Sequence, residues 1–326
     1  MNNLTFLLRS TLLGLASFLL GSNVSLAQMG ENGGHKMLIN GDSLYVEVMG
    51  KGDPIVFIPG GPGNSHDYMQ LYMGDLADKY QLIFFDAFGR GYSARAKSPS
   101  EYSIQRDIDD LEALREALHL DKWTVFGHSY GTVVAQGYAL AHPDHLKRLV
   151  IAAGFHSGEM WQANCDSYNH LCQTQFPEKW AKVDSLRHEG YVSSDSVFMD
   201  VYGSIPTGFM YIHDMHNRKK LERKPDMAPD HMMNTDVYYT LIGRDADFFV
   251  GGQMIDLDYR KRLKEVKAPT LLLFGRYDFV AIPEYAIQYK KYMPQAEFVM
   301  FENSGHNPMA EEHDKFRKVF DAFMKK

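Results

Sequence analysis

The sequence has little of what metal, nucleotide and nucleic-acid chemistry usually require. Its 326 residues include only two cysteines and no His-Glu-x-x-His pattern, so the usual signals of a metal site are missing. No Gly-Lys-Ser/Thr phosphate loop and no dinucleotide fingerprint is present. Acidic residues outnumber basic ones by 41 to 34, and the net charge of −7 does not favour nucleic acid or an anionic membrane as a partner. We therefore expect no metal, no cofactor and no nucleic-acid partner.

Long apolar runs are also scarce, and the clearest one lies at the N-terminus. The run from Thr11 to Leu20 follows Arg9 and is too short to span a bilayer. Ser25 and Ala27 then place small residues at the −3 and −1 positions of a cleavage site. The sequence therefore predicts a signal peptide over residues 1–27 and an exported, periplasmic or secreted, mature chain without a membrane span.

The rest of the chain has the composition of a globular enzyme, with 45% hydrophobic and 13% aromatic residues. Patterns of buried strands alternate with helical spacing from Ser43 onward. We expect strands at 44–48, 55–58, 82–86, 123–126, 148–152, 271–274 and 297–301, and helices at 67–79, 103–118, 132–140, 283–292 and 310–324. Ser103 is the expected N-cap of its helix, with Asp107 as a favourable acid in the first half. The alternation predicts an α/β fold with a mostly parallel central sheet and helices on both faces.

Residues 155–257 interrupt this alternation. They contain no buried strand pattern, are rich in methionine, and show helical patterns near 177–189 and 235–242. We interpret this inserted segment as a mainly helical cap over the carboxyl ends of the strands, where open α/β sheets bind ligands. Residues 28–154 and 258–326 would then form the catalytic domain. The methionines either fill gaps in a small core or line an adaptable apolar pocket.

Both cysteines, Cys165 and Cys172, fall in the inserted segment. An exported chain can keep a disulfide. On one straight helix their Cα atoms would be about 10 Å apart, too far for a bridge, whereas a corner between them would allow one. The sequence is therefore compatible both with a disulfide between the two cysteines and with two free thiols.

A five-residue motif, Gly127-His128-Ser129-Tyr130-Gly131, lies between a strand pattern and a helix pattern. A serine between two glycines at a strand-to-helix turn is typical of a nucleophile elbow. The glycines are needed because side chains would collide with neighbouring backbone in so sharp a turn.

Two later strand ends supply partners for Ser129. Asp278 follows the strand pattern at 271–274, and His306 follows the one at 297–301. Serine needs a base, and the base needs an orienting acid. The order Ser, Asp, His along the chain is that of α/β hydrolases, so we predict these three residues as a catalytic triad.

The transition state of acyl transfer also needs donors for its oxyanion. One is expected from the backbone N–H of Tyr130, directly after the nucleophile. The other is expected from Gly61, in the glycine-rich loop at residues 59–63.

Three segments resemble the prolyl iminopeptidase family of serine peptidases. Residues 59–63, Pro-Gly-Gly-Pro-Gly, look like its His-Gly-Gly-Pro-Gly loop, and residues 86–93 look like its Asp-Gln-Arg-Gly-x-Gly-x-Ser strand end. Residues 127–131 are similar to its elbow. Pro59 departs from the histidine of the family, and Ala87-Phe88 from its Gln-Arg. The resemblance implies an α/β-hydrolase fold and release of N-terminal residues from short peptides.

Members of this family hold the free amine of the substrate with carboxylates of the cap. The resemblance implies Asp247 as this anchor, with Asp245 as the alternative and Glu159 as a second carboxylate. Each acid could equally be solvated or cap a helix. The leading hypothesis is an aminopeptidase acting through an acyl-enzyme. The alternative is a carboxylesterase or lactonase with the same triad, and a complete triad argues against a non-catalytic binding protein.

Overall fold

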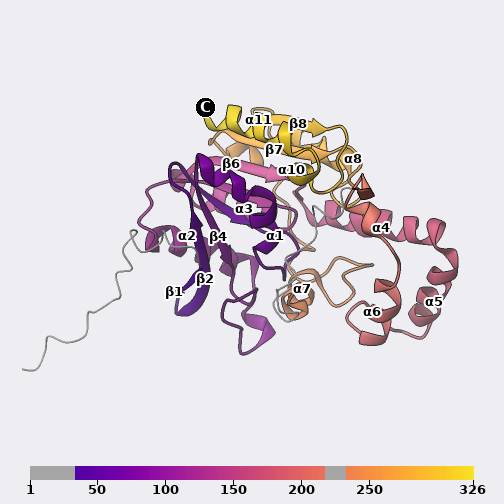
Figure 1. Ribbon diagram of the computed structural model, residues 1–326. Coiled ribbons are helices and arrows are strands. Elements are labelled where there is room, and N and C mark those ends of the chain that lie inside the picture. Colours follow the sequence, from indigo (N-terminus) through magenta and orange to yellow (C-terminus); the bar gives the residue numbers. More distant parts are fainter. Residues whose placement is uncertain (1–33, 217–232) are drawn as a thin grey trace, which may run out of the picture.

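The computed structural model describes residues 34–216 and 233–326, shown as coloured ribbon in Figure 1. The predicted signal peptide at 1–27 lies outside the described residues. Within them, no helix has both the length and the apolar character needed to cross a membrane.

The centre of the molecule is one eight-stranded sheet in the order β1-β2-β4-β3-β5-β6-β7-β8. Its strands are β1 (His35–Ile39), β2 (Asp42–Met49), β3 (Pro54–Ile58), β4 (Gln81–Asp86), β5 (Trp123–His128), β6 (Leu146–Ala152), β7 (Thr270–Gly275) and β8 (Glu297–Phe301). β2 pairs antiparallel with β1 and with β4, and all other pairs are parallel. The predicted α/β fold with a mostly parallel sheet is confirmed.

Helices cover both faces of the sheet. They are α1 (Asp67–Met73), α2 (Ile104–Ala117), α3 (Gly131–Ala141), α8 (Pro283–Ala286), α9 (Tyr289–Tyr292), α10 (Pro308–Glu311) and α11 (His313–Met324). Side chains of α1 and α11 pack with Ile55 and Phe57 of β3, and those of α2 and α3 pack with Val56 and Ile58. Alternate residues of a strand point to opposite faces. The continuous apolar runs in β3 and β5 therefore reflect a sheet that is buried on both sides.

The start of α2 forms as its sequence indicates. The Ser103 side chain accepts a hydrogen bond from the Arg106 N–H, which satisfies one of the free donors at the helix start. The expected helix at 103–118 is thus confirmed, with its first helical residue at Ile104.

The inserted segment carries α4 (Gly158–Gln175), α5 (Pro177–His188), α6 (Ser196–Gly203), η4 (Gly208–Met210) and α7 (Thr235–Ile242). Its described residues contain no strand. Figure 1 shows α5 and α6 on one side of the molecule, apart from the helices that cover the sheet. α4, α5 and α6 share a small apolar cluster formed by Cys172, Val183, Phe198, Tyr202 and Ile205, whereas Val237, Leu241 and Ile242 of α7 belong to the main core.

Several elements differ from the sequence-based expectations. β1, α4 and α6 were not expected, because β1 is short and half exposed, α4 is mostly polar and α6 is short. The helix expected at 283–292 is divided into α8 and α9, and the one expected at 310–324 is divided into α10 and α11. The two cysteines do not form a disulfide. Cys165 and Cys172 are buried free thiols on one helix, α4, at a spacing that no disulfide can bridge.

Candidate active site

Ser129 occupies the sharp turn between β5 and α3. Its backbone has φ +53°, in the left-handed region that costs a non-glycine residue about 1–3 kcal/mol. A Cβ added to Gly127 would lie 2.6 Å from the Gly131 carbonyl oxygen, and one added to Gly131 would lie 2.1 Å from that of Ile58. Only glycine fits at both positions. The chain therefore builds a strained turn that directs Ser129 into a cavity at the carboxyl edge of the sheet.

His306 and Asp278 form a buried pair beyond the ends of β8 and β7. The Nδ1 atom of His306 lies 2.9 and 3.1 Å from the two carboxylate oxygens of Asp278. Asp278 is 1% exposed, and its Oδ1 also accepts the N–H groups of Val280 and Ala281. Because Nδ1 faces the carboxylate, Nε2 is the ring nitrogen left for proton transfer. His306 lines the same cavity as Ser129.

Two consecutive acids at the C-terminal end of α10, Glu311 and Glu312, hold the loop that carries His306. Glu311 accepts the N–H of Gly305 and also that of His213, in the inserted segment. Burial raises the pKa of Glu311, and its hydrogen bonds to backbone N–H groups oppose this. Glu312 accepts the Ser304 hydroxyl at 2.7 Å. The loop is thereby fixed to the helix behind it and to the inserted segment above it.

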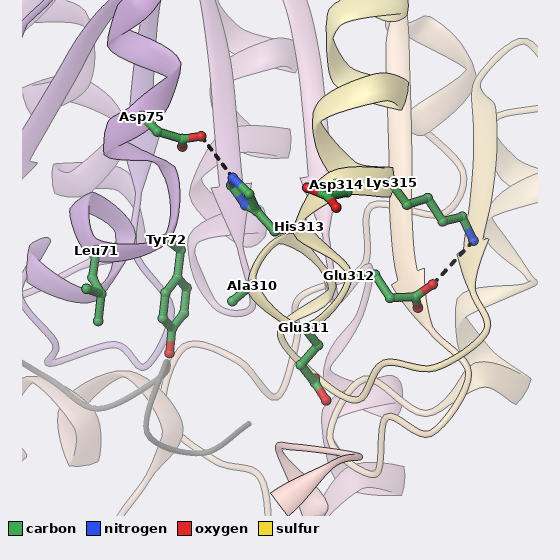
Figure 2. A pocket seen from close by; sticks show the side chains of 9 residues that line it. All are labelled: Leu71, Tyr72, Asp75, Ala310, Glu311, Glu312, His313, Asp314 and Lys315. Atoms are coloured by element: carbon green, nitrogen blue, oxygen red, sulfur yellow. Dashed lines mark hydrogen bonds and ion pairs between the residues drawn. The ribbon is translucent and has the colours of Figure 1, made fainter. Parts of the chain in front are cut away.

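Glu311 and Glu312 also border a surface cavity of about 700 Å³ between α1 and the α10–α11 corner (Figure 2). Its other described lining residues are Leu71, Tyr72, Asp75, Ala310, His313, Asp314 and Lys315. This cavity is larger than the one at Ser129, but Ser129, Asp278 and His306 do not line it. Its residues are engaged in ion pairs such as that of His313 with Asp75, at 2.9 Å.

The glycine-rich loop after β3 folds directly against Ser129. A Cβ added to Gly60 would lie 2.6 Å from Cβ of Ser129, so bare backbone is required there. Gly61 has φ +61°, and Asn64 donates to the carbonyl oxygens of both glycines. This places the Gly61 backbone beside the nucleophile. On the other side, Tyr130 precedes α3 and carries one of the N–H groups that a helix start leaves without an intrahelical acceptor.

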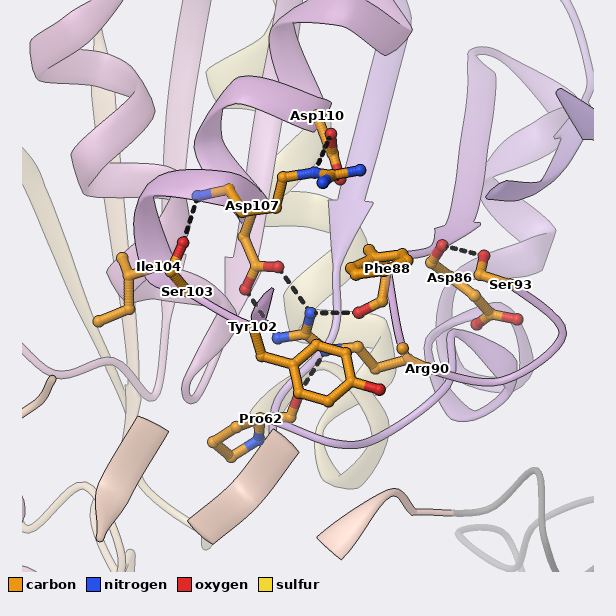
Figure 3. Close-up of polar contacts among 12 residues, drawn as sticks. Pro62, Asp86, Phe88, Arg90, Ser93, Tyr102, Ser103, Ile104, Asp107 and Asp110 are labelled. Atoms are coloured by element: carbon orange, nitrogen blue, oxygen red, sulfur yellow. Dashed lines mark hydrogen bonds and ion pairs between the residues drawn. The ribbon is translucent and has the colours of Figure 1, made fainter. Parts of the chain in front are cut away.

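A buried ion pair between Arg90 and Asp107 connects the segments of these two predicted oxyanion donors. Figure 3 shows this pair and the hydrogen bond of Arg90 with the Pro62 carbonyl. Arg90 donates to both carboxylate oxygens of Asp107, at 2.6 and 2.7 Å, and through Nε to the Pro62 carbonyl at 2.6 Å. The hydroxyl of Tyr130 donates to the same carboxylate at 3.1 Å. Removing one partner of such a pair typically costs about 3–5 kcal/mol. Arg90 and Asp107 thus fix the glycine-rich loop relative to the residue after Ser129.

The cavity at Ser129 has a volume of about 400 Å³ and lies between the sheet edge and the inserted segment. Its described lining includes Gly60, Gly61, Asn64, Tyr68, His128, Ser129, Trp161, Asn164, Met199, Tyr211, Met233, Tyr238, Tyr239, Asp247, Val280 and His306. Of the methionines, Met199 and Met233 line the cavity, whereas Met160 and Met254 are buried in the core. Both interpretations of the methionines therefore hold, each at different residues.

The three candidate amine anchors have different surroundings. Asp247 is the one acidic residue among the described residues that line the cavity. Burial raises its pKa to about 6, the Asp245 charge adds to this, and a hydrogen bond with Ser193 opposes it. Asp245 is paired with Arg187 through two hydrogen bonds of 2.7 Å. Glu159 is exposed and paired with Arg260 at 2.5 Å. The structure therefore brings Asp247 to the cavity but neither Asp245 nor Glu159.

Comparison with known proteins identifies the family. A family model described as the alpha/beta hydrolase fold matches residues 53–313. The chain belongs to this family. It is an α/β hydrolase, and its hydrolase activity follows from that membership.

Curated relatives carry a more specific name. A proline iminopeptidase from Heyndrickxia coagulans is 28% identical over 309 residues, covering 93% of this hydrolase and 96% of the relative. One from Saccharolobus solfataricus is 28% identical over 297 residues, covering 89% and 91%. The predicted resemblance to this family is confirmed.

Solved structures similar to this hydrolase show the same fold. The proline iminopeptidase of Mycobacterium smegmatis superposes with a TM-score of 0.72 at 21% identity, covering 90% of the hydrolase and 98% of the other chain. An esterase from Exiguobacterium antarcticum gives 0.65 at 20% identity, covering 90% and 100%. At these identities the likeness supports the fold alone.

One group of side chains in residues 34–216 and 233–326 of the hydrolase has the spacing of a metal site. The possible ligand atoms of Glu112, His142 and His145 lie within 4.8 Å of one another. The Glu112 carboxylate already accepts from Arg115 at 2.6 Å and from the Tyr138 hydroxyl at 2.7 Å. Partial burial would raise its pKa, but these hydrogen bonds lower it to about 2. The positively charged guanidinium of Arg115 would lie against any bound cation and repel it. These residues therefore fit a hydrogen-bonded cluster better than a metal site.

Several residues at the site of the hydrolase were not expected from the sequence. Arg90 and Asp107 lie 17 positions apart, and Tyr68 and His128 lie 60 apart. Asp107 was interpreted only as a favourable charge near a helix start. The one local signal for Arg90 is its position as a charged residue between two glycines, which indicates a side chain with a specific partner.

Proposed function

We propose that this α/β hydrolase is an aminopeptidase that releases N-terminal residues from short peptides through an acyl-enzyme on Ser129. The observation that carries the proposal is Asp247, the one acid among the described residues that line the same cavity as Ser129. The names of the curated relatives support the same reaction.

The proposed acylation uses the residues at the three strand ends. Ser129 Oγ attacks the scissile carbonyl carbon while His306 Nε2 takes the hydroxyl proton. The Gly61 and Tyr130 N–H groups donate to the oxyanion, and Asp278 stabilises the imidazolium that forms. As the carbon–nitrogen bond breaks, His306 protonates the leaving amine. Water then attacks the acyl-enzyme, with His306 as base, and releases the N-terminal residue.

Substrate selection would depend on the free α-ammonium group. A carboxylate in a cavity walled by Trp161, Tyr238 and Tyr239 is only partly solvated, so an ammonium group compensates its charge. An internal peptide would place an uncharged amide opposite the same carboxylate, at a desolvation cost with no ion pair in return. The arrangement thus favours cleavage at the first peptide bond.

A carboxylesterase or lactonase activity is the second candidate. The aromatic and methionine side chains of the cavity favour it, because they would accept an apolar acyl group without an amine. The two candidates are separated by comparing arylamides of proline and other amino acids with their N-acetylated analogues and with simple aryl esters. We expect turnover of the free-amine arylamides and none of the acetylated ones. Brisk ester cleavage with no turnover of any aminoacyl amide would support the esterase instead.

The pH profile should depend on whether the substrate carries an amine. Asp247 is ionised above its raised pKa of about 6, so it holds the ammonium group above this pH and loses it as the pH falls below. We expect kcat/KM for a free-amine arylamide to show an acid-side loss near pH 6 that an amine-free ester does not share. The base, His306, serves both substrates, so the difference between the two profiles reports on amine binding. Identical acid limbs for the two substrates would show that Asp247 does not bind the amine.

A further inference from the structure

A chain of hydrogen bonds through Tyr68 and His128 joins the three loops that meet at the cavity. The Gly60 N–H donates to the Tyr68 hydroxyl oxygen. That oxygen lies 2.8 Å from Nδ1 of His128, and Nε2 of His128 lies 2.9 Å from the backbone carbonyl oxygen of His306. The glycine-rich loop, the elbow and the loop of His306 are therefore linked by two side chains.

The partners at the two ends determine where the protons lie. A carbonyl oxygen only accepts, so Nε2 of His128 must carry a hydrogen toward His306. A backbone N–H only donates, so the Tyr68 oxygen accepts from Gly60. When His128 is neutral and carries its hydrogen on Nε2, its Nδ1 is an acceptor and the Tyr68 hydroxyl donates to it. In this state every bond of the chain has one donor and one acceptor.

The surroundings of His128 keep it neutral. Its side chain is 4% exposed, and its ring lies 4.9 Å from that of His306, centroid to centroid. Burial, and then the nearby charge of His306, lower the pKa of His128 to about 3, although its hydrogen bond to the His306 backbone opposes this. His128 therefore stays uncharged when His306 becomes an imidazolium during acylation, and the hydrogen bonds keep their direction.

We propose that Tyr68 and His128 are positioning residues that hold the glycine-rich loop and His306 in register with Ser129. His128 directly precedes Ser129, Gly60 directly precedes Gly61, and the carbonyl at the far end belongs to His306 itself. Each bond thus fixes the backbone next to one reacting group. The inference rests on the proposed serine mechanism, but it holds for an aminopeptidase or an esterase. A misplacement of about 1 Å at such a site can cost about 10²-fold in rate.

The test compares three substitutions in the full-length protein. Tyr68→Phe and His128→Leu remove the chain, whereas His128→Gln keeps one acceptor and one donor. We expect the first two to lower kcat by about 10- to 100-fold with KM nearly unchanged, and His128→Gln to recover most of the loss. The combination of Tyr68→Phe with His128→Leu should have a kcat no lower than that of the poorer single variant, because both substitutions break the same chain.

Tyr80→Phe is the matched control. Tyr80 lies directly before β4, away from the cavity, and its hydroxyl donates to Asp321 at 3.0 Å.

Two further measurements separate this proposal from the proposed function. The rate of Ser129 modification by a fluorophosphonate needs no knowledge of the substrate and should fall in parallel with kcat. Nitrogen chemical shifts should show His128 neutral, with its hydrogen on Nε2, from pH 5 to pH 9. An effect of Tyr68→Phe on KM alone, a His128→Gln variant as poor as His128→Leu, or titration of His128 in that range would overturn the proposal. Wild-type protein that does not react with the fluorophosphonate would instead refute the serine mechanism.

Discussion

Ser129→Ala is expected to lower kcat by about four to six orders of magnitude for every substrate of the enzyme. The reason is that the nucleophile, its base and its acid act as a unit, so loss of the hydroxyl leaves only binding and the oxyanion donors. The left-handed backbone at this position is as accessible to alanine as to serine, so the fold should be unchanged. Circular dichroism and the thermal midpoint would check this, and steady-state assays would measure the loss.

The control for Ser129→Ala is Ser185→Ala, which changes an exposed serine on α5 whose hydroxyl donates to Glu189 at 3.4 Å, outside the cavity. It should leave kcat and KM unchanged. Activity of Ser129→Ala within about tenfold of the wild type would mean that another group forms the acyl-enzyme.

Asp247→Asn is expected to lower kcat/KM for free-amine substrates by roughly 30-fold to several thousand-fold. Truncating one partner of a buried, hydrogen-bonded charge pair costs about 2–5 kcal/mol, and each 1.4 kcal/mol is a factor of ten. The kcat/KM for an amine-free aryl ester should fall much less, because its transition state makes no ion pair with Asp247. The decisive quantity is therefore the ratio of kcat/KM for the free-amine substrate to kcat/KM for the ester. A general loss of folded protein does not change this ratio.

Glu159→Gln is the matched control for this substitution. Glu159 is an acid of the same segment, but it is exposed and paired with Arg260 outside the cavity. It should leave the ratio of amide to ester hydrolysis unchanged. An equal loss of both activities in Asp247→Asn would assign Asp247 to the structure of the cavity wall and not to amine recognition.

The site residues whose placement the sequence predicted well are those whose positions follow from local patterns. Ser129 between two glycines needs only a strand before it and a helix after it. Asp278 and His306 follow continuous apolar runs, and parallel strands bring their carboxyl ends to the same edge of a sheet. The order of these residues along the chain was therefore enough to predict that they meet.

The residues that the sequence predicted poorly depend on distant partners. Asp245 and Glu159 are engaged by Arg187 and Arg260, which are 58 and 101 positions away, and nothing near either acid indicates this. The hydrogen bond of Tyr68 with His128 likewise spans 60 positions. α4 was missed because its apolar contacts come from both the inserted segment and the core, which gives its sequence no single apolar stripe.

The most direct test of the account is the reaction of the enzyme with an aminoalkyl phosphonate diphenyl ester, in which Ser129 Oγ attacks phosphorus and phenolate leaves. Mass spectrometry of the digested protein locates the adduct, and the rate is measured for the free-amine reagent and its N-acetylated analogue. We predict a single adduct on Ser129, formed at least about tenfold faster with the free amine, and loss of this preference in Asp247→Asn. An adduct on another residue, or equal rates for the two reagents, would contradict the account.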